Sequence, residues 1–378
     1  DRQGPLPVGL YQGEGGIVRK HKLPKDRIIF YLPYSFGDLE TGSKVRPYKM
    51  YQSFLRLGYK VDLIAGTPDE RITKYKEVLA SGENYAFCYA EASSYPLHPI
   101  LDYRVLLGIR RLAIPMGIYY RDAYWKFEDY FPYKGVKRLE LLLRYHTDLL
   151  LFSQIASVMF FPTDSLSHLF KLRIPKIILP PGGEYRPLKR EFTRPLRAVY
   201  VGGVTYRYGI QLMLEALEFV NQEKVHLVLE LVCRRNELEA LPQHIQMLVR
   251  APWVNIHHIS GDALQSIYSR CHIGLIPIIK DAYNDLAFPV KMFEYLSFGL
   301  PIVATHCKEM SKFIKTNGCG IICRDDAQSM ADTLNLLTHD LDTVQRLSVR
   351  AVQTILNGNL WEDRAKLVAN TLDLRGAN

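Results

Sequence analysis

The chain has 378 residues, of which 48% are hydrophobic and 23% are charged. This length exceeds the usual size of a single core and predicts two domains, and the composition is that of a globular protein. The formal charge of +9 at pH 7 indicates an anionic partner. A nucleotide-sugar, a nucleic acid and an acidic membrane surface are the three candidate classes. We expect no nucleic-acid partner, because the sequence has no helix-turn-helix, zinc-finger or RNA-binding motif.

Cysteine usage and hydropathy bear on the compartment. Six cysteines, at positions 88, 233, 271, 307, 319 and 323, show no pairing framework, which indicates reduced core thiols in a cytoplasmic protein. No apolar run has the roughly 20 residues that a membrane-spanning helix needs. We expect no secretory signal ahead of the first predicted strand. Residues 1–26 are rich in Gly, Pro and basic side chains, and we expect an N-terminal arm with little structure.

Strands and helices alternate in the first half of the chain. The pattern predicts strands over 27–33, 60–65, 85–91 and 117–121, with helices near 45–57, 99–112 and 136–145. Such alternation is typical of a parallel sheet covered by helices, so residues 27–183 are predicted to form one Rossmann-like α/β domain. The Pro-Pro-Gly-Gly run at 180–183 breaks the pattern, and the polar segment 184–195 has no clear period and reads as a linker.

A second series of elements begins after the linker. Strands are predicted over 196–201, 226–232, 254–257, 273–277, 301–304 and 320–323, and the chain ends in helices. The strand at 196–201 runs into Gly202 and Gly203. Glycine lets the backbone approach a diphosphate closely where a β carbon would obstruct it. The alternative is a plain turn from strand to helix.

The most informative segment is the short predicted helix before Gly299. Pro289 suits the start of the helix, and Gly299 suits a left-handed C-terminal cap. Lys291 and Glu294 are three residues apart and share one face of the helix near its start. Free N–H groups and the helix dipole favour an anion there, and Lys291 adds a full charge, while Glu294 can accept from a ribose hydroxyl. The alternative is a Lys–Glu surface pair on an ordinary amphipathic helix.

These motifs resemble GT-B glycosyltransferases, specifically the family-4-like retaining enzymes. The likeness is carried by Pro-x-Lys-x-x-Glu-Tyr at 289–295, by Gly-x-Pro-Ile at 299–302 and by the glycine loop at 202–209, and it covers about residues 196–372 well. It implies two Rossmann-like domains whose parallel sheets face a central cleft. Residues 27–183 would bind the acceptor and 196–360 the nucleotide-sugar, and a helix at 361–378 would cross back to the first domain. It implies that Glu294 binds the ribose and that Lys291 faces the diphosphate.

The sequence departs from that family at several positions. Relatives carry a basic residue just after the first glycine of the loop and another before its last glycine, where this chain has Gly203 and Tyr208. Arg207 and Arg234 are candidates to supply the displaced charge. Relatives also place a second Glu eight residues before the first, to contact the transferred sugar. Here that position is Leu286, and the neighbouring residues Asn284 and Asp285 are candidates to bind the donor.

Two candidate positions lie in the first half. The segment Gly42-Ser43-Lys-Val-Arg46-Pro is predicted to be a loop entering a helix, where relatives place a loop that faces donor phosphate and acceptor; its alternative is a surface turn. Asp122 follows a predicted buried strand, at the mouth of a parallel sheet where ligands gather, and is the best candidate for a general base. It could also orient the acceptor, or simply cap a helix.

Metal is not expected in catalysis, because Lys or Arg can stabilise the leaving diphosphate. Asp38 and Glu40 have the spacing of a metal-binding pair but lie in a predicted loop of the acceptor half. The sequence therefore predicts transfer of a sugar from a nucleoside diphosphate sugar to a glycan or lipid-linked acceptor, with retention and without a cofactor, with Asp122, Lys291 and Arg207 as catalytic candidates. An inverting enzyme with Asp122 as base and a silent glycan-binding or partner-binding subunit are the alternatives.

The segment 124–138 interleaves six aromatic residues with Lys126, Lys134, Lys137 and Arg138. Aromatic rings favour the headgroup region of a bilayer, and basic residues favour an anionic lipid surface. We therefore expect a peripheral protein on the inner face of the cell membrane that takes part in polysaccharide biosynthesis. An aromatic wall of the acceptor cleft is the alternative.

Overall fold

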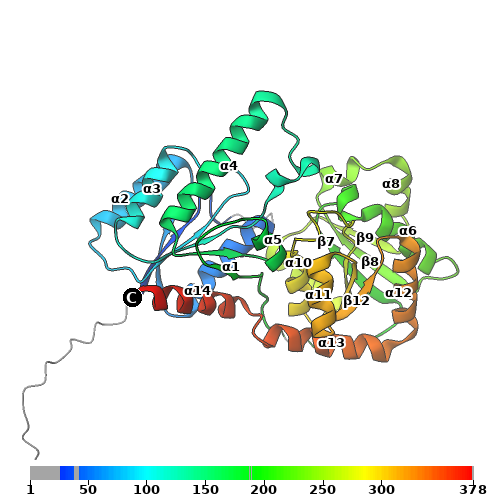
Figure 1. Cartoon of the computed structure of the whole chain (residues 1–378). Helices are drawn as coiled ribbons and strands as arrows, with labels where there is room; N and C mark the ends of the chain where they lie inside the picture. The colour runs from blue at the N-terminus through cyan, green and yellow to red at the C-terminus, as the bar shows by residue number, and fades with distance from the viewer. Residues whose placement is uncertain (1–25, 38–41, 187, 189, 377–378) are drawn as a thin grey trace, which may run out of the picture.

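The computed structural model describes residues 26–37, 42–186, 188 and 190–376. The chain folds into two α/β domains that lie side by side, each built around a six-stranded sheet (Figure 1). The α/β class and the two Rossmann-like domains predicted from the sequence are confirmed. The predicted N-terminal arm lies outside the described residues, except for residue 26.

The first sheet has the strand order β2-β1-β3-β4-β5-β6, and all neighbouring strands are parallel. The strands of the central part are buried on both faces, as expected where helices cover both sides of a parallel sheet. The strands of this domain are β1 (Arg27–Tyr31), β2 (Lys60–Ile64), β3 (Cys88–Glu91), β4 (Met116–Tyr119), β5 (Val158–Phe161) and β6 (Lys176–Ile178).

Helices cover the two faces of the first sheet unequally. One face packs against α2, α3 and α4, and the other packs against α1 and the C-terminal helix α14. The helices of the first domain are α1 (Gly42–Arg56), α2 (Pro68–Ala80), α3 (Leu101–Arg110), α4 (Gly135–Ile155) and α5 (Asp164–His168), with short 3₁₀ turns η1 (Tyr124–Lys126) and η2 (Glu128–Tyr130).

The second sheet repeats the parallel design with the order β12-β11-β10-β7-β8-β9. Its strands are β7 (Leu196–Val201), β8 (Leu227–Val232), β9 (Val254–His257), β10 (Ile273–Ile276), β11 (Ile302–Thr305) and β12 (Gly320–Cys323). Its helices are α6 (Ile210–Val220), α7 (Arg235–Glu239), α8 (Gln243–Val249), α9 (Leu264–Arg270), α10 (Val290–Ser297), α11 (Lys308–Asn317), α12 (Ala327–His339) and α13 (Leu341–Leu356), with 3₁₀ turns η3 (Tyr206–Tyr208) and η4 (Gly261–Ala263).

The last helix, α14 (Trp361–Gly376), leaves the second domain and packs along α1 of the first (Figure 1). Trp361, Val368 and Leu372 are buried in the core that β1 and α1 share. A short parallel bridge between Gly183 and Leu360 joins the chain where it first leaves the first domain to the chain where it returns.

Several element boundaries differ from the sequence-based prediction. The helix expected from 45 begins at Gly42, so Arg46 lies on a helix and not in a loop. The helix expected over 136–145 runs to Ile155, and strand β5 after it was missed. The run from 148 to 161 is mostly apolar with four scattered polar residues, so its periodicity does not separate helix from strand. Helix α2 was also missed, although Thr67 and Glu70 form a capping box at its start.

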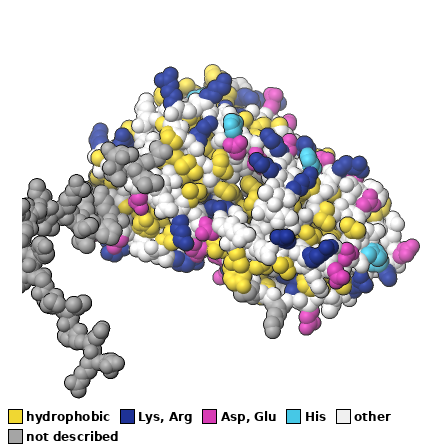
Figure 2. Space-filling model, turned by 60° about the horizontal axis from the view of Figure 1, so that its bottom comes forward, with side chains coloured by type: hydrophobic (Ala, Val, Ile, Leu, Met, Phe, Trp, Pro, Cys, Tyr) yellow, Lys and Arg dark blue, Asp and Glu magenta, His cyan; other side chains and the backbone are white. Residues whose placement is uncertain are grey.

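The six cysteines are all free and buried, as the sequence predicted. Among the described residues, no helix is long and apolar enough to cross a membrane. Lys and Arg side chains are spread over both domains on the face shown in Figure 2, which agrees with the dispersed basic residues of the sequence.

Candidate active site

The candidate donor site lies at the carboxyl end of β7, where the chain turns at Gly202. Gly202 has φ +146, a conformation that residues with a β carbon rarely adopt, and its N–H donates to the carbonyl of Val232 at 3.0 Å. Two residues after Gly202, the N–H of Val204 donates to the Glu237 carboxylate at 3.1 Å. The glycine turn is therefore held from both sides by β8 and α7.

Helix α10 places Lys291 against this turn. A β carbon at Gly202 would lie 2.6 Å from Nζ of Lys291. Nζ is buried, makes no hydrogen bond within the described residues, and lies 4.3 Å from the centre of the Tyr200 ring. Burial lowers the pKa of Lys291 to about 8, although the nearby Glu294 charge acts in the opposite direction. An unpaired buried cation beside a glycine turn is an arrangement that an anionic ligand would complete.

Glu294 lies one turn further along α10 and is partly buried. The hydroxyl of Tyr268, on α9, donates to its carboxylate at 3.2 Å. Burial raises the pKa of Glu294, while the Tyr268 hydrogen bond and the charges of Lys49 and Lys291 oppose that rise. Lys49 belongs to α1 of the first domain and pairs with Glu184 at 2.7 Å. Because the Lys49 charge acts on Glu294, Glu294 lies on the side of α10 that is near the first domain.

The rest of α10 fixes these two side chains. Met292, Phe293 and Leu296 are fully buried in the core, as their helical spacing predicted, and Gly299 adopts φ +66 after the last turn. The Tyr295 hydroxyl accepts a hydrogen bond from the N–H of Val201 at 2.8 Å. This bond ties α10 directly to the end of β7, and no sequence pattern pointed to it.

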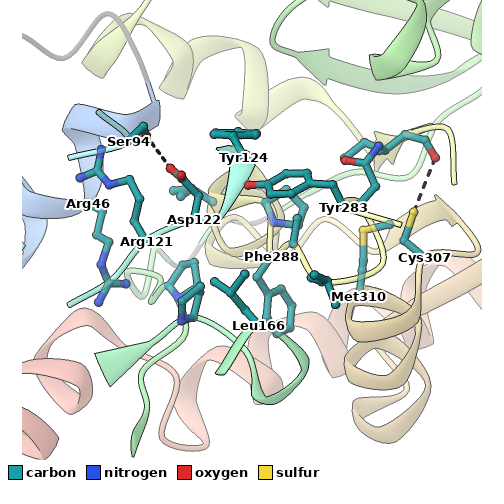
Figure 3. A pocket seen from close by; sticks show the side chains of 18 of the residues that line it. Arg46, Ser94, Arg121, Asp122, Tyr124, Leu166, Tyr283, Phe288, Cys307 and Met310 are labelled. Atoms are coloured by element: carbon teal, nitrogen blue, oxygen red, sulfur yellow. Dashed lines mark hydrogen bonds between the residues drawn. The ribbon is translucent and has the colours of Figure 1, made fainter. Parts of the chain in front are cut away.

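A cavity of about 260 Å³ lies between the two domains (Figure 3), and Pro289 and Val290, which directly precede Lys291, are among the residues that line it. Tyr208 lines the cavity, and its ring centre is 5.7 Å from Nζ of Lys291. The first domain contributes Arg46, Arg121 and Asp122 to its polar end, while apolar side chains that include Leu166, Phe288 and Met310 line the remainder. The cavity therefore adjoins the candidate donor site and has room for part of an acceptor.

Asp122 follows β4 and points into this cavity. Its carboxylate accepts a hydrogen bond from the Ser94 hydroxyl at 2.5 Å. Burial raises the pKa of Asp122, and the Ser94 hydrogen bond and the Arg121 charge oppose that rise. Ser94 was missed by sequence reasoning, although it follows β3 as Asp122 follows β4, and the ends of adjacent parallel strands meet at one edge of the sheet.

Arg46 and Arg121 share one buried carboxylate. Glu91, at the end of β3, lies 3.3 Å from Nε of Arg46 and 3.4 Å from Nη2 of Arg121. The Arg46 guanidinium also stacks on Tyr119 at 3.5 Å and donates to the carbonyl of Pro180 at 3.3 Å. Arg46 therefore connects α1 to Glu91 of the sheet and to Pro180, where the chain leaves the first domain. Its side chain also lines the cavity.

Two arginines proposed to supply positive charge have other contacts in the structure. Arg207 donates to the carbonyl of Asp129 and stacks over the Tyr130 ring at 4.0 Å, so it links η3 of the second domain to the first domain. Arg234 is exposed and pairs with Glu237 at 2.6 Å. Gly203 lies close to the Tyr208 ring, which would be 2.7 Å from a β carbon at that position.

The residues around position 286 make hydrogen bonds and packing contacts within the protein. Asn284 lines the cavity and donates to the carbonyl of Ile279 at 2.8 Å, while the Asp285 carboxylate accepts from the N–H of Lys308 at the start of α11. Leu286, which stands where relatives carry a Glu, packs on the first-domain core, and its carbonyl accepts from the Thr163 hydroxyl at 2.7 Å. This position contributes an interdomain contact, and its side chain has no carboxylate.

Two predictions concern residues of which the structure says little. Asp38 and Glu40 lie outside the described residues, and for Gly42 and Ser43 only the backbone, in the first turn of α1, is described. Among the described residues, no group of three His, Cys, Asp or Glu side chains could hold a metal ion.

The aromatic segment at 124–138 is partly internal. Trp125 and Phe131 are buried in the first-domain core, and Tyr124 and Tyr130 stack with Tyr283 across the cleft. Trp125 and Phe131 are therefore unavailable to a membrane, whereas Tyr124 is 36% exposed. The stacking of Tyr124 on Tyr283 agrees with the alternative of an aromatic wall in the cleft. Sequence spacing did not reveal this, because it does not show which rings the second domain covers.

Comparison with known proteins gives a class for this arrangement. Residues 195–340 match the family model described as Glycosyl transferases group 1. Similar solved structures include sucrose-phosphate synthase from Thermosynechococcus elongatus, with 14% identity, a TM-score of 0.66 and coverage of 93% of this chain and 100% of that one. HepE from Anabaena, solved with UDP and glucose, has 13% identity, a TM-score of 0.65 and coverage of 92% and 99%.

WaaG, a glycosyltransferase involved in lipopolysaccharide biosynthesis, has 14% identity, a TM-score of 0.62 and coverage of 91% and 99%. Among curated protein sequences, none matches this chain. At these identities the structural likeness establishes the fold, which is GT-B, as the sequence predicted. Residues 195–340, which lie in the second domain, match a glycosyltransferase family model, and this match identifies the protein as a glycosyltransferase.

Proposed function

We propose that the protein transfers a sugar from a nucleoside diphosphate sugar to a glycan or lipid-linked acceptor, with retention of configuration and without metal. The observation that carries this proposal is the unpaired, buried ammonium of Lys291 beside the Gly202 turn. A diphosphate seated at the turn would supply the missing partner, and charge on its leaving oxygen would grow as the sugar–phosphate bond breaks. Lys291 therefore has a role in both binding and catalysis.

The nucleotide would lie along α10. The Glu294 carboxylate accepts from Tyr268 and has further lone pairs for the ribose hydroxyls. HepE has been solved with UDP and with UDP-glucose, so UDP is the first nucleotide to test. With Arg207 and Arg234 both engaged elsewhere, Lys291 is the principal candidate for charge on the diphosphate.

The acceptor would enter from the first domain. The cavity at Asp122 has hydrogen-bonding groups at one end and apolar side chains at the other, which suits a hydroxyl on a partly apolar acceptor. In the retaining mechanism, Asp122 orients that hydroxyl while its proton passes to the leaving phosphate. WaaG acts in lipopolysaccharide biosynthesis, and we place this protein in the synthesis of a comparable polysaccharide on the inner face of the cell membrane.

Two alternatives have specific support. The buried Asp122 carboxylate at the cavity end could be the base of an inverting transferase. The use of position 286 for an interdomain contact, with no carboxylate there for the sugar, would fit a silent subunit that binds glycan without transferring sugar. Release of free sugar or transfer from a nucleotide-sugar excludes the silent subunit.

A thermal-shift titration tests the donor assignment. The full chain is heated with increasing UDP, GDP, ADP or their glucose conjugates, and a ligand that binds only the folded state raises Tm with concentration. We expect one nucleoside diphosphate to raise the Tm of the wild type and to have a much smaller effect on Lys291→Met. The donor assignment fails if none raises Tm. Transfer that EDTA abolishes and Mg²⁺ or Mn²⁺ restores would contradict the metal-free mechanism alone.

A further inference from the structure

Helix α4 of the first domain has a row of large apolar side chains on its outer surface. Val136, Leu139, Leu143 and Leu150 are 85%, 69%, 64% and 59% exposed. At about 100° per residue, these four positions fall within about 60° of one another around the helix. Val136, Leu139 and Leu143 lie on successive turns, and Leu150 lies two turns further along the same side, beyond the exposed His146 and Thr147. We call these four apolar side chains the α4 strip.

The opposite side of the same helix makes the core contacts. Leu141, Tyr145, Leu149 and Phe152 are buried against the sheet, so α4 already has the apolar face that attaches it to the domain. The α4 strip is therefore a second apolar face. Exposed apolar side chains that occur singly are ordinary, whereas a contiguous row of them indicates a binding surface.

Basic side chains accompany the strip. Lys134 and Lys137 are exposed at the start of α4, and Arg104 and Arg110 are exposed on the adjacent helix α3. Glu140 is the one exposed acidic residue of α4, because the helix's other acid, Asp148, is buried. Glu140 pairs with Lys137 at 3.0 Å and with Arg144 at 3.7 Å, so the exposed side of α4 still has an excess of positive charge. An apolar strip with a positively charged border is complementary to a bilayer that has anionic headgroups.

We propose that α4 docks on an anionic lipid surface, with the α4 strip inserted at the headgroup boundary and the basic residues at its border on lipid phosphates. The proposal deepens the membrane location given above and rests on it, but it moves the contact from the buried aromatic segment to the outer face of α4. In Figure 1, α4 lies along the upper edge of the first domain and its upper end projects beyond the neighbouring helices.

Docking at α4 would also place the cavity at a fixed position relative to the bilayer. The chain runs from Asp122, at the cavity end, through η1 and η2 to the first turn of α4 at Gly135. The cavity and the basic start of α4 are thus joined by a short segment that is packed against the domain core. A lipid-linked acceptor held in the bilayer would reach Asp122 along this side of the molecule.

Vesicle sedimentation tests the docking surface without donor or acceptor, so its outcome is independent of the donor assignment. The full chain is mixed with phosphatidylglycerol vesicles or with phosphatidylcholine vesicles at low and high salt. We expect wild type to bind the anionic vesicles and to bind less as salt rises. The variant Leu139→Ser/Leu143→Ser is expected to bind at least about tenfold less strongly, because burial of two leucines is lost.

The matched control is Leu336→Ser/Val349→Ser. These residues lie on α12 and α13 of the second domain and are 56% and 57% exposed, close to the exposure of Leu139 and Leu143. The control variant should bind vesicles as wild type does. Lys134→Gln/Lys137→Gln should lose affinity at low salt and differ little from wild type at high salt.

Three results would overturn the proposal. They are wild type remaining in the supernatant at low salt, equal loss of binding in the two serine pairs, and vesicle binding that does not depend on anionic lipid. Light scattering adds a further outcome: a dimer that Leu139→Ser/Leu143→Ser dissociates would assign the α4 strip to a second copy of the chain and not to lipid. Circular dichroism and Tm of both serine pairs confirm that each remains folded.

Discussion

Gly202 and Lys291 approach each other so closely that a β carbon on the glycine would lie 2.6 Å from the ammonium nitrogen of the lysine. The two residues are 89 positions apart in the chain (291 − 202), and they meet because β7 and α10 share one core. Because Gly202 has no side chain, the buried ammonium can lie against the turn, where it makes no hydrogen bond within the described residues.

The first prediction concerns Gly202→Ala. The new methyl group would meet Nζ of Lys291 and would also force a side chain into φ +146, so we expect nucleoside diphosphate affinity to fall at least tenfold. Gly261→Ala is the control, since Gly261 has φ +61 in the same domain with nothing within 4 Å of its β carbon. Calorimetric titration with UDP measures both, and equal losses in the two variants would contradict a specific role for the turn.

The second prediction is that Lys291→Met stabilises the empty protein while impairing its function. Burial holds the pKa of Lys291 at about 8, against an ordinary value of 10.5, and this shift corresponds to at most about 3 kcal/mol. Replacing the buried ammonium by a thioether of similar length should therefore raise Tm at pH 7. This gain should be largest below pH 8 and should vanish above pH 10.5, where the lysine is neutral in both states.

In the same variant, turnover should fall more than donor affinity, because the charge on the leaving diphosphate grows in the transition state. Steady-state kinetics with a responsive nucleotide-sugar separate kcat from KM. A lower Tm in the empty variant together with unchanged kcat would contradict the role of an unpaired functional cation.

The third prediction is a pH dependence of nucleotide binding. The ammonium of Lys291 is charged below a pKa of about 8 and loses its proton above it, so affinity for a nucleoside diphosphate should decrease as pH rises from 7 to 9. Lys291→Arg remains charged throughout this range and should show a flatter profile. Parallel profiles for the two proteins, measured by titration at each pH, would assign the dependence to another group.

The fourth prediction concerns Glu294→Gln. The amide keeps the size of the side chain but offers the ribose hydroxyls a weaker acceptor, and we expect a loss of about 1–3 kcal/mol in donor binding. Tyr268→Phe is the control, because it removes the 3.2 Å hydrogen bond to the carboxylate and leaves the carboxylate in place. Unchanged affinity in a folded Glu294→Gln protein would remove Glu294 from the donor site.

The fifth prediction separates retention from inversion through Ser94. Its hydroxyl lowers the pKa of the Asp122 carboxylate, so Ser94→Ala should raise that pKa further above its ordinary range. In an inverting enzyme the acid limb of kcat/KM would then move to higher pH, because the base must be deprotonated. We expect no such movement and a product with the configuration of the donor, and NMR of the anomeric proton decides between the two outcomes.

The sequence by itself determined the class of fold, the end of helix α10 and the side of α10 that is buried. Alternating strands and helices required a parallel sheet in each half, and Gly299 could end α10 with φ +66 for a local reason that the sequence contains. The helical spacing of Met292 and Leu296, four residues apart, fixed which side of α10 is buried. These inferences held because each depends on residues within one or two turns of each other.

The tertiary structure alone decided which side chains meet and which remain exposed. Tyr268 reaches Glu294, and Ser94 reaches Asp122, across separations that no local pattern encodes. Burial of Trp125 and exposure of Leu139 likewise depend on which elements cover each face. Hydrophobic periodicity reports that a helix has an apolar side, but the packing of whole domains decides whether that side meets protein or solvent.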